Sequence, residues 1–108
     1  MRNKGTKSIE INFHVGKELF SKMSVLQDAG LNSSAIARLA IRKCSESRLD
    51  EESESAFPQR LLLYLHADEA KLLDELAAKQ GDRLRAHTLR RLIATYLRIH
   101  SSSIEALF

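Results

Sequence analysis

Apolar and polar residues alternate with a period of two near the start of the chain and again just past its midpoint. The apolar positions are Ile9, Ile11, Phe13 and Val15 in the first stretch, and Leu61, Leu63 and Leu65 in the second. This alternation is typical of a strand that buries one face and leaves the other free. Leu62 blurs the second stretch because it is apolar at an outward position. We therefore predict two half-buried strands.

Each predicted strand is followed by two stretches of helical periodicity, in which apolar residues recur every three or four positions. Gly30 and Gly81 separate the two helices of each pair, and both are expected to adopt the left-handed conformation that ends a helix. Candidate capping residues are Asn32, Ser33 or Ser34 for the second helix and Asp68 for the third. The last helix is expected to run from about Leu84 to Arg98. The chain thus repeats a unit of strand, helix, glycine turn and helix.

The repeat divides the chain into five segments. Residues 1–7 form a basic N-terminal arm, 8–45 the first repeat, 46–58 an acidic linker, 59–100 the second repeat and 101–108 a tail. The linker holds five carboxylates and three serines, so it is expected to be solvated and mobile. A repeat of about 40 residues rarely folds alone, so both repeats are expected to form one domain. The simplest arrangement is mainly α, with a two-stranded antiparallel β-ribbon laid on four helices.

Charge is distributed unevenly along the 108 residues, whose formal net charge is +3. The linker combines five acids with Arg48, a local charge of −4, which leaves +7 for the remainder. The single cysteine, Cys44, excludes an internal disulfide, and the four histidines lack the spacing of a metal site. Because no catalytic, cofactor or metal motif is recognised, an enzyme is not expected. No apolar run has membrane-spanning length and no secretory signal is recognised, so a cytoplasmic protein is expected.

Two sequence runs carry a resemblance to a known family. Residues 15–20, Val-Gly-Lys-Glu-Leu-Phe, span the first strand-to-helix junction, and residues 32–36, Asn-Ser-Ser-Ala-Ile, open the second helix. Together with the order of elements, they resemble the ribbon-helix-helix family of DNA-binding proteins, which includes Arc and MetJ. Two copies in one chain resemble the tandem arrangement of the plasmid conjugation protein TraY. The resemblance implies that the two repeats form one intramolecular pseudo-dimer.

The resemblance also implies that the outward face of the ribbon enters the DNA major groove, which is wide enough for two strands. Carried over by register, the base-reading residues are Glu10, Asn12, His14, Arg60, Leu62 and Tyr64. Phosphate contacts are implied at the starts of the second helices and in the arm, at Ser33, Ser34, Arg83, Arg85, His87 and Lys7. This chain departs from the family pattern at Glu10, which is acidic where a neutral or basic residue is usual, and at apolar Leu62.

Each outward side chain has a candidate partner on DNA. The pairings are Asn12 with adenine, Arg60 with guanine, Glu10 with the N4 amino group of cytosine, Leu62 with the thymine methyl group, and His14 or Tyr64 with a base or a phosphate. A second interpretation of Leu62 is a strand buried on both faces, against a second molecule or the tail. Four other basic residues are better interpreted as solvated surface, namely Arg42, Lys43, Arg90 and Arg98.

Three functions remain open from the sequence. The first is a repressor of a bacterial, plasmid or phage operon, which is the commonest role in the family that the chain resembles. The second is a TraY-like accessory protein that binds a plasmid transfer origin and acts with a relaxase. The third is a protein-interaction module that has lost DNA binding, which Glu10, Leu62 and the modest net charge favour. Double-stranded DNA is the expected partner, with further copies of the chain on adjacent subsites, and no cofactor or membrane is expected.

Overall fold

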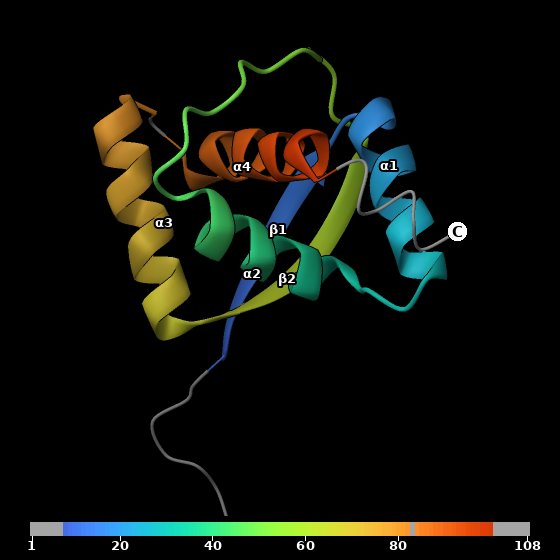
Figure 1. Ribbon diagram of the computed structural model, residues 1–108, viewed down its shortest axis with the longest axis horizontal. Coiled ribbons are helices and arrows are strands. Elements are labelled where there is room, and N and C mark those ends of the chain that lie inside the picture. The colour runs from blue at the N-terminus through green and yellow to red at the C-terminus, as the bar shows by residue number, and fades with distance from the viewer. Residues whose placement is uncertain (1–7, 83, 101–108) are drawn as a thin grey trace, which may run out of the picture.

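Two strands and four helices follow one another in the predicted order. The computed structural model describes residues 8–82 and 84–100. Its elements are β1 (Ser8–Val15), α1 (Lys17–Asp28), α2 (Ser33–Cys44), β2 (Gln59–His66), α3 (Ala67–Gln80) and α4 (Arg85–Ile99). In Figure 1 the strands run behind α2 and α4, with α1 and α3 on opposite sides. The described chain is therefore mainly helical with one two-stranded sheet, as its hydrophobic pattern predicts.

The register of the sheet determines which side chains face outward. The strands β1 and β2 pair antiparallel, and Asn12 lies opposite Leu62 at the centre of the ladder. Farther out, Glu10 faces Tyr64 on one side of this central pair, and Ile11 faces Leu63 directly beside it. Because side chains alternate across a strand, all even-numbered positions of both strands share one face. The odd-numbered positions share the other face, which points toward the helices.

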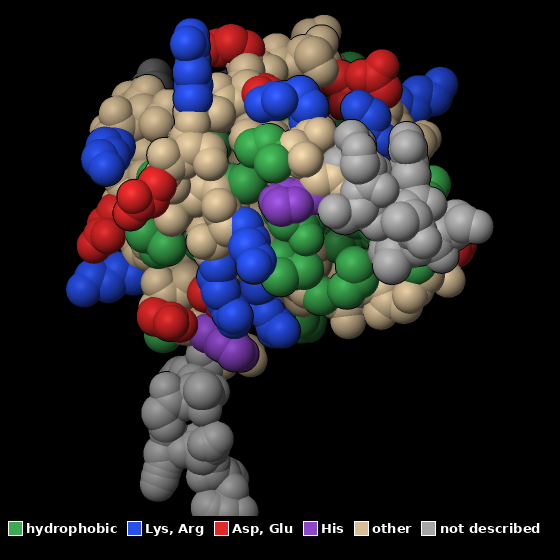
Figure 2. Space-filling view, in the orientation of Figure 1, with side chains coloured by type: hydrophobic (Ala, Val, Ile, Leu, Met, Phe, Trp, Pro, Cys, Tyr) green, Lys and Arg blue, Asp and Glu red, His purple; other side chains and the backbone are tan. Residues whose placement is uncertain are grey.

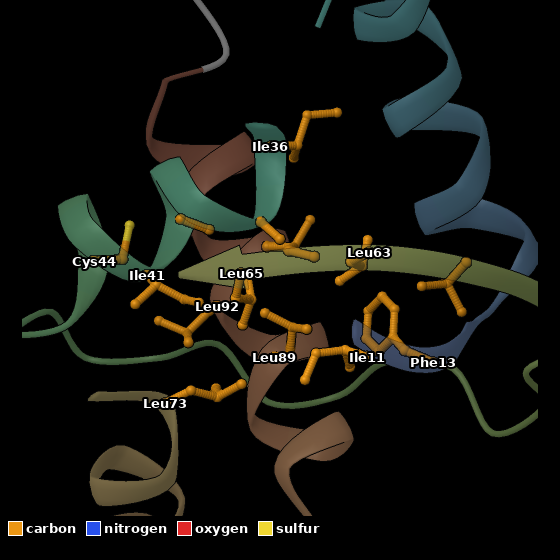
Figure 3. Packing of buried hydrophobic residues seen from close by; sticks show 14 of the residues in the cluster. Ile11, Phe13, Ile36, Ile41, Cys44, Leu63, Leu65, Leu73, Leu89 and Leu92 are labelled. Atoms are coloured by element: carbon orange, nitrogen blue, oxygen red, sulfur yellow. The ribbon is translucent and has the colours of Figure 1, made fainter. Parts of the chain in front are cut away.

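The core lies between the inner face of the sheet and the helices. Its largest fully buried side chains are Phe13, Met23, Leu26, Ile36, Ile41, Leu63, Leu65, Leu73, Leu89, Leu92 and Ile93. Figure 3 shows the inward residues of both strands beside those of α2 and α4. Both repeats contribute to one continuous cluster. Each repeat supplies a single strand, so each strand has its hydrogen-bonding partner in the other repeat. The burial of this shared apolar surface is the main stabilising contribution to the fold.

The first helix of each repeat ends in the same motif. Gly30 and Gly81 have positive φ angles of 101° and 77°, as predicted. In both turns, the residue after the glycine donates its N–H to the carbonyl five positions earlier, at 2.9 Å. This is the Schellman arrangement, which satisfies the carbonyls left free at a helix end and favours glycine at the left-handed position.

The helix starts confirm one predicted cap and correct another. Asn32 is the cap of α2, because its side-chain oxygen accepts the Ala35 N–H at 2.8 Å. The prediction that Asp68 caps the third helix is wrong, since α3 already begins at Ala67. Instead, the carboxylate of Glu69 reaches back and accepts the His66 N–H at 2.9 Å. The last helix begins and ends one residue later than expected.

The middle of the linker is packed against the helices, so the prediction that this segment is solvated is wrong there. Leu49 is buried within the core cluster. The Asp50 N–H donates to the Thr95 hydroxyl at 2.8 Å, and Arg91 Nε donates to the Asp50 carbonyl at 2.9 Å. We call residues 49–54 the acidic strap. The acidic composition of the strap suggests a solvated segment, but its carboxylates and carbonyls pair with arginines of α4.

Leu62 and Leu63 provide a test of the sheet register, because they are adjacent on opposite faces of β2. Leu63 is fully buried and Leu62 is 42% exposed. We expect Leu63→Ala to lower the free energy of unfolding by about 2–5 kcal/mol, and Leu62→Ala to lower it by less than about 1 kcal/mol. Urea unfolding of both variants measures the difference. Equal losses would contradict this register and would favour a strand buried on both faces.

Candidate nucleic-acid interface

The outer face of the ribbon brings together all six residues predicted to read bases. Glu10, Asn12, His14, Arg60, Leu62 and Tyr64 are exposed and occupy the even-numbered positions of the two strands. The face is about two residues wide, one from each strand, with strands about 4.8 Å apart in any such sheet. Six side chains with hydrogen-bonding or apolar character therefore project in one direction from a pair of strands.

The two ends of this face differ in chemistry. His14 lies opposite Arg60 at one end, whereas Glu10 lies opposite Tyr64 at the other. The first end presents mainly donors and a positive charge, and the second presents a carboxylate acceptor. In a major groove, donors match the O6 and N7 acceptors of guanine, and an acceptor matches the amino groups of cytosine or adenine. The face is therefore chemically polarised along its length.

A hydrogen bond between the strands constrains Asn12. Arg60 Nε donates to Asn12 Oδ1 at 2.9 Å, which occupies one lone pair of the amide oxygen. Bidentate adenine reading uses the same oxygen as an acceptor and the amide nitrogen as a donor. While Arg60 holds the oxygen, Asn12 and Arg60 together present mostly donors, which fit guanine better than adenine. The predicted pairing of Asn12 with adenine requires that this bond be released or shared.

The flank along the outer edge of β2 is formed by the start of α2. Ser34 Oγ accepts the Tyr64 N–H at 2.9 Å, so the helix terminus is tied to the strand. Ser33 Oγ accepts from the Gln27 side chain at 2.9 Å. Both hydroxyls keep a proton that can be donated, and the amides of the first helical turn point toward the same region. These two predicted phosphate-binding residues therefore lie beside the ribbon, next to a helix N-terminus that favours anions.

The equivalent flank along β1 is formed by the start of α4, where the basic side chains already contact carboxylates. Arg85 contacts Asp74 at 2.9 Å. The two ring nitrogens of His87 lie 2.6 Å from a Glu52 oxygen and 3.4 Å from an Asp82 oxygen. Arg83 and Lys7, also predicted to bind phosphate, lie outside the described residues. The second repeat thus carries predicted phosphate ligands that carboxylates of the same chain already occupy.

Arg90 is a central residue of this flank that the sequence interpretation missed. Its prediction as solvated surface is wrong, because its side chain is only 13% exposed. Arg90 Nη1 donates to the His14 carbonyl at 3.0 Å, its Nε pairs with Glu52, and its guanidinium lies 3.8 Å from the centre of the Phe57 ring. The repeat contained a sign of this burial. The second helices of the two repeats align at a shift of 53 residues, which pairs Arg90 with Ala37, and Ala37 is fully buried.

The end of the acidic strap caps a helix. The Glu54 carboxylate accepts the Glu18 N–H at 3.0 Å and the Leu19 N–H at 3.2 Å, both in the first turn of α1. Gly16 makes room for it, because a Cβ at this position would overlap the carboxylate. Glycine is needed here for close approach, since its φ of −79° is open to any residue. The strap is therefore fixed to α1 at one end and to α4 along its middle.

The middle of the strap is held by charge pairs. Asp50 accepts from Arg98 Nε at 2.8 Å and from Nη2 at 2.9 Å, a two-pronged contact that lowers the pKa of the carboxyl group. The sequence predicts a solvated surface position for Arg98 as for Arg90, and Arg98 is indeed exposed, but its guanidinium pairs with Asp50. On the underside of the strap, burial raises the pKa of the Cys44 thiol, as expected for an ordinary helix residue facing the core.

The helix side of the molecule is a poorer candidate for binding DNA. Figure 2 shows this side, where basic, acidic and hydrophobic side chains are interspersed. Arg42, interpreted from sequence as solvated, pairs with the buried Glu69 at 2.6 Å, whereas Lys43 is exposed as expected. A cation that is already neutralised gains less from a phosphate than a free one. The ribbon face and its β2 flank are therefore the better candidates.

Comparison of the chain with protein-family models, curated proteins and solved structures found no match. The geometry of the ribbon face and its flanks is therefore the basis for assigning a function. Within residues 8–82 and 84–100, no group of three or more histidine, cysteine, aspartate or glutamate residues could hold a metal ion. None of the helices in that described part is long and apolar enough to cross a membrane.

Asp50→Asn is expected to destabilise the protein at neutral pH and to have little effect in acid. Because its folded-state pKa lies below the usual 3.8, the carboxylate contributes stability above that value and loses it as the pH falls through the lowered pKa. Urea unfolding of both proteins at pH 7 and in stronger acid tests this. A difference in unfolding free energy that stays constant with pH would show that the charge of Asp50 does not anchor the strap.

Proposed function

We propose that this chain is a sequence-specific double-stranded DNA-binding protein of the ribbon-helix-helix type, with both repeats forming one intramolecular pseudo-dimer. The observation that carries the proposal is the antiparallel register, which gathers the outward positions of both strands on one exposed face. A two-stranded ribbon fits the major groove, which is about 12 Å wide. In the proposed complex, this face lies on the base edges and the helix termini lie along the phosphates.

The register also supports the pseudo-dimer. Asn12 and Leu62 are equivalent positions of the two repeats, fifty residues apart, and they lie opposite each other. The same shift exchanges the Glu10–Tyr64 pair with the His14–Arg60 pair. A two-fold axis through the Asn12–Leu62 pair would relate the paired positions on either side of it in this way. The matching hydrogen bonds of the turns at Gly30 and Gly81 also support the pseudo-dimer.

The proposed biological role is transcriptional repression of a bacterial, plasmid or phage operon by occupation of an operator. A ribbon reads only a few base pairs, so one molecule discriminates weakly among sites. Several copies on adjacent subsites, or a partner protein, would supply the missing specificity. An accessory role at a plasmid transfer origin, with a relaxase as partner, uses the same interface. The position of the preferred site, at a promoter or at a transfer origin, distinguishes these two roles.

A protein-interaction module is the second candidate. The exposure of Leu62 and Tyr64 on the ribbon face favours it, because large apolar side chains on a free surface often mark a protein contact. The carboxylate of Glu10 also lowers the attraction of this face for a polyanion. DNA binding remains the preferred proposal, because Leu62 can contact a thymine methyl group and Tyr64 keeps a hydroxyl for a polar contact.

Selection from random duplex DNA tests the proposal. The wild type should enrich a short asymmetric motif, because the two ends of the ribbon face differ. The triple change Asn12→Ala, His14→Ala and Arg60→Ala should lose the motif, with discrimination falling by about 1–3 kcal/mol for each base that is no longer read. Circular dichroism of the triple variant controls for folding. Weak wild-type binding without enrichment, abolished by moderate salt, would favour the interaction module instead.

A symmetrised ribbon face tests the pseudo-dimer independently. The changes Arg60→Glu, Leu62→Asn and Tyr64→His give both strands the outward residues of β1. Because the two halves of the face then match, the selected motif should become palindromic. The converse changes in β1, namely Glu10→Arg, Asn12→Leu and His14→Tyr, should select a different palindrome. An unchanged asymmetric motif in both variants would rule out symmetric readout by the ribbon.

A further inference from the structure

The two flanks of the ribbon occupy equivalent places but carry opposite chemistry. A ribbon inserted in a groove has one phosphate backbone along each of its outer edges. Beside β2, Ser34 bonds the strand at the Tyr64 N–H. Beside β1, Arg90 bonds the strand at the His14 carbonyl, and His87, which aligns with Ser34 in the repeat, lies one helical turn away. The first flank presents neutral donors, whereas the second presents two potential cations.

Those two basic side chains share one carboxylate. Glu52 lies 2.6 Å from His87 Nδ1, and both of its oxygens accept from Arg90, at Nε and, over 3.4 Å, at Nη2. The Glu52 side chain is only 14% exposed. An arginine fork with a further N–H donor is the set of groups that binds a phosphate oxygen pair. Glu52 therefore occupies the donors of Arg90 and His87, which could otherwise bind a DNA phosphate.

The position of Glu52 is determined by its neighbours in the strap. On one side, Arg91 holds the Asp50 carbonyl at 2.9 Å, and Leu49 is buried in the core. On the other side, Glu54 caps the first turn of α1. The pocket directly beside Glu52, which Arg90 and Phe57 also line, has a volume of about 50 Å³. The carboxylate is thus placed at the β1 flank by anchors that precede and follow it.

We propose that Glu52 is an internal competitor of DNA phosphate at the β1 flank, an inference that rests on the proposed DNA-binding function. By occupying Arg90 and His87, it confines backbone contact to the β2 flank at α2. The Asn12–Arg60 donors would then contact base edges while the α2 flank contacts phosphates. Because only one flank binds phosphate, one orientation of the chain on its site is favoured over the reverse. The strap also lowers affinity for DNA of arbitrary sequence, most of which comes from phosphate contacts.

Glu52→Gln tests the competition, with Glu51→Gln as the matched control. The control removes the same charge from the neighbouring residue, whose side chain is 93% exposed and lies 3.8 Å from Arg91. For Glu52→Gln, we expect affinity for random-sequence duplex DNA to rise up to about tenfold near 0.1 M salt, and the salt slope to steepen by about 0.9 for each additional phosphate that the protein neutralises. The control should match the wild type in both quantities.

Ser34→Glu provides a second variant that does not disturb the strap. A carboxylate on the open flank should lower affinity up to about tenfold and make the salt slope shallower by about 0.9. Binding by Ser34→Glu equal to that of the wild type would overturn the one-sided contact. Equal effects of Glu52→Gln and Glu51→Gln, or no effect of either in a folded protein, would overturn the competition. Wild-type protein that binds no duplex even at low salt would instead overturn the proposed function itself.

Discussion

The antiparallel register between β1 and β2 is the constraint on which the rest of the structure depends. Each repeat has one strand, and a single strand has no partner for its backbone groups within its own repeat. Pairing Asn12 with Leu62 satisfies both strands and directs Ile11 and Leu63 toward the helices. A slip by one residue would exchange the two faces of a strand, exposing the core and burying Glu10. Fold and candidate interface therefore have the same origin.

The charges of α4 impose a second constraint, which explains the composition of the linker. Arg91 is buried and Arg90 is nearly so, and buried cations are tolerated only with anionic or carbonyl partners. The strap supplies these partners through Glu52 and the carbonyls of residues 49 and 50. Asp50 and Glu52 are thus part of the packing of the second repeat. The first repeat has Ala37 at the position of Arg90 and needs no such partner there.

The sequence predicted the elements well because they depend on local patterns. The alternation of apolar and polar residues located both strands. Gly30 and Gly81 located the helix ends, because glycine adopts the left-handed conformation at a helix end more readily than other residues. The strap was missed because composition records charges without the partners that neutralise them. The Asn12–Arg60 bond was also beyond sequence reasoning, because it joins diagonal neighbours across the ladder and depends on how a long side chain turns.

Covalent linkage of the repeats allows an interface that two separate copies could not form. In a homodimer, any carboxylate at one flank appears at the other, so both flanks are neutralised or neither is. In this chain the segment that joins the repeats occurs once, and Glu52 can act on the β1 flank alone. The outward residues of the two strands also differ, which gives the ribbon face a donor end and an acceptor end. If the proposed DNA binding holds, the asymmetry of the face and that of its flanks would act together to set one orientation of the protein on its site.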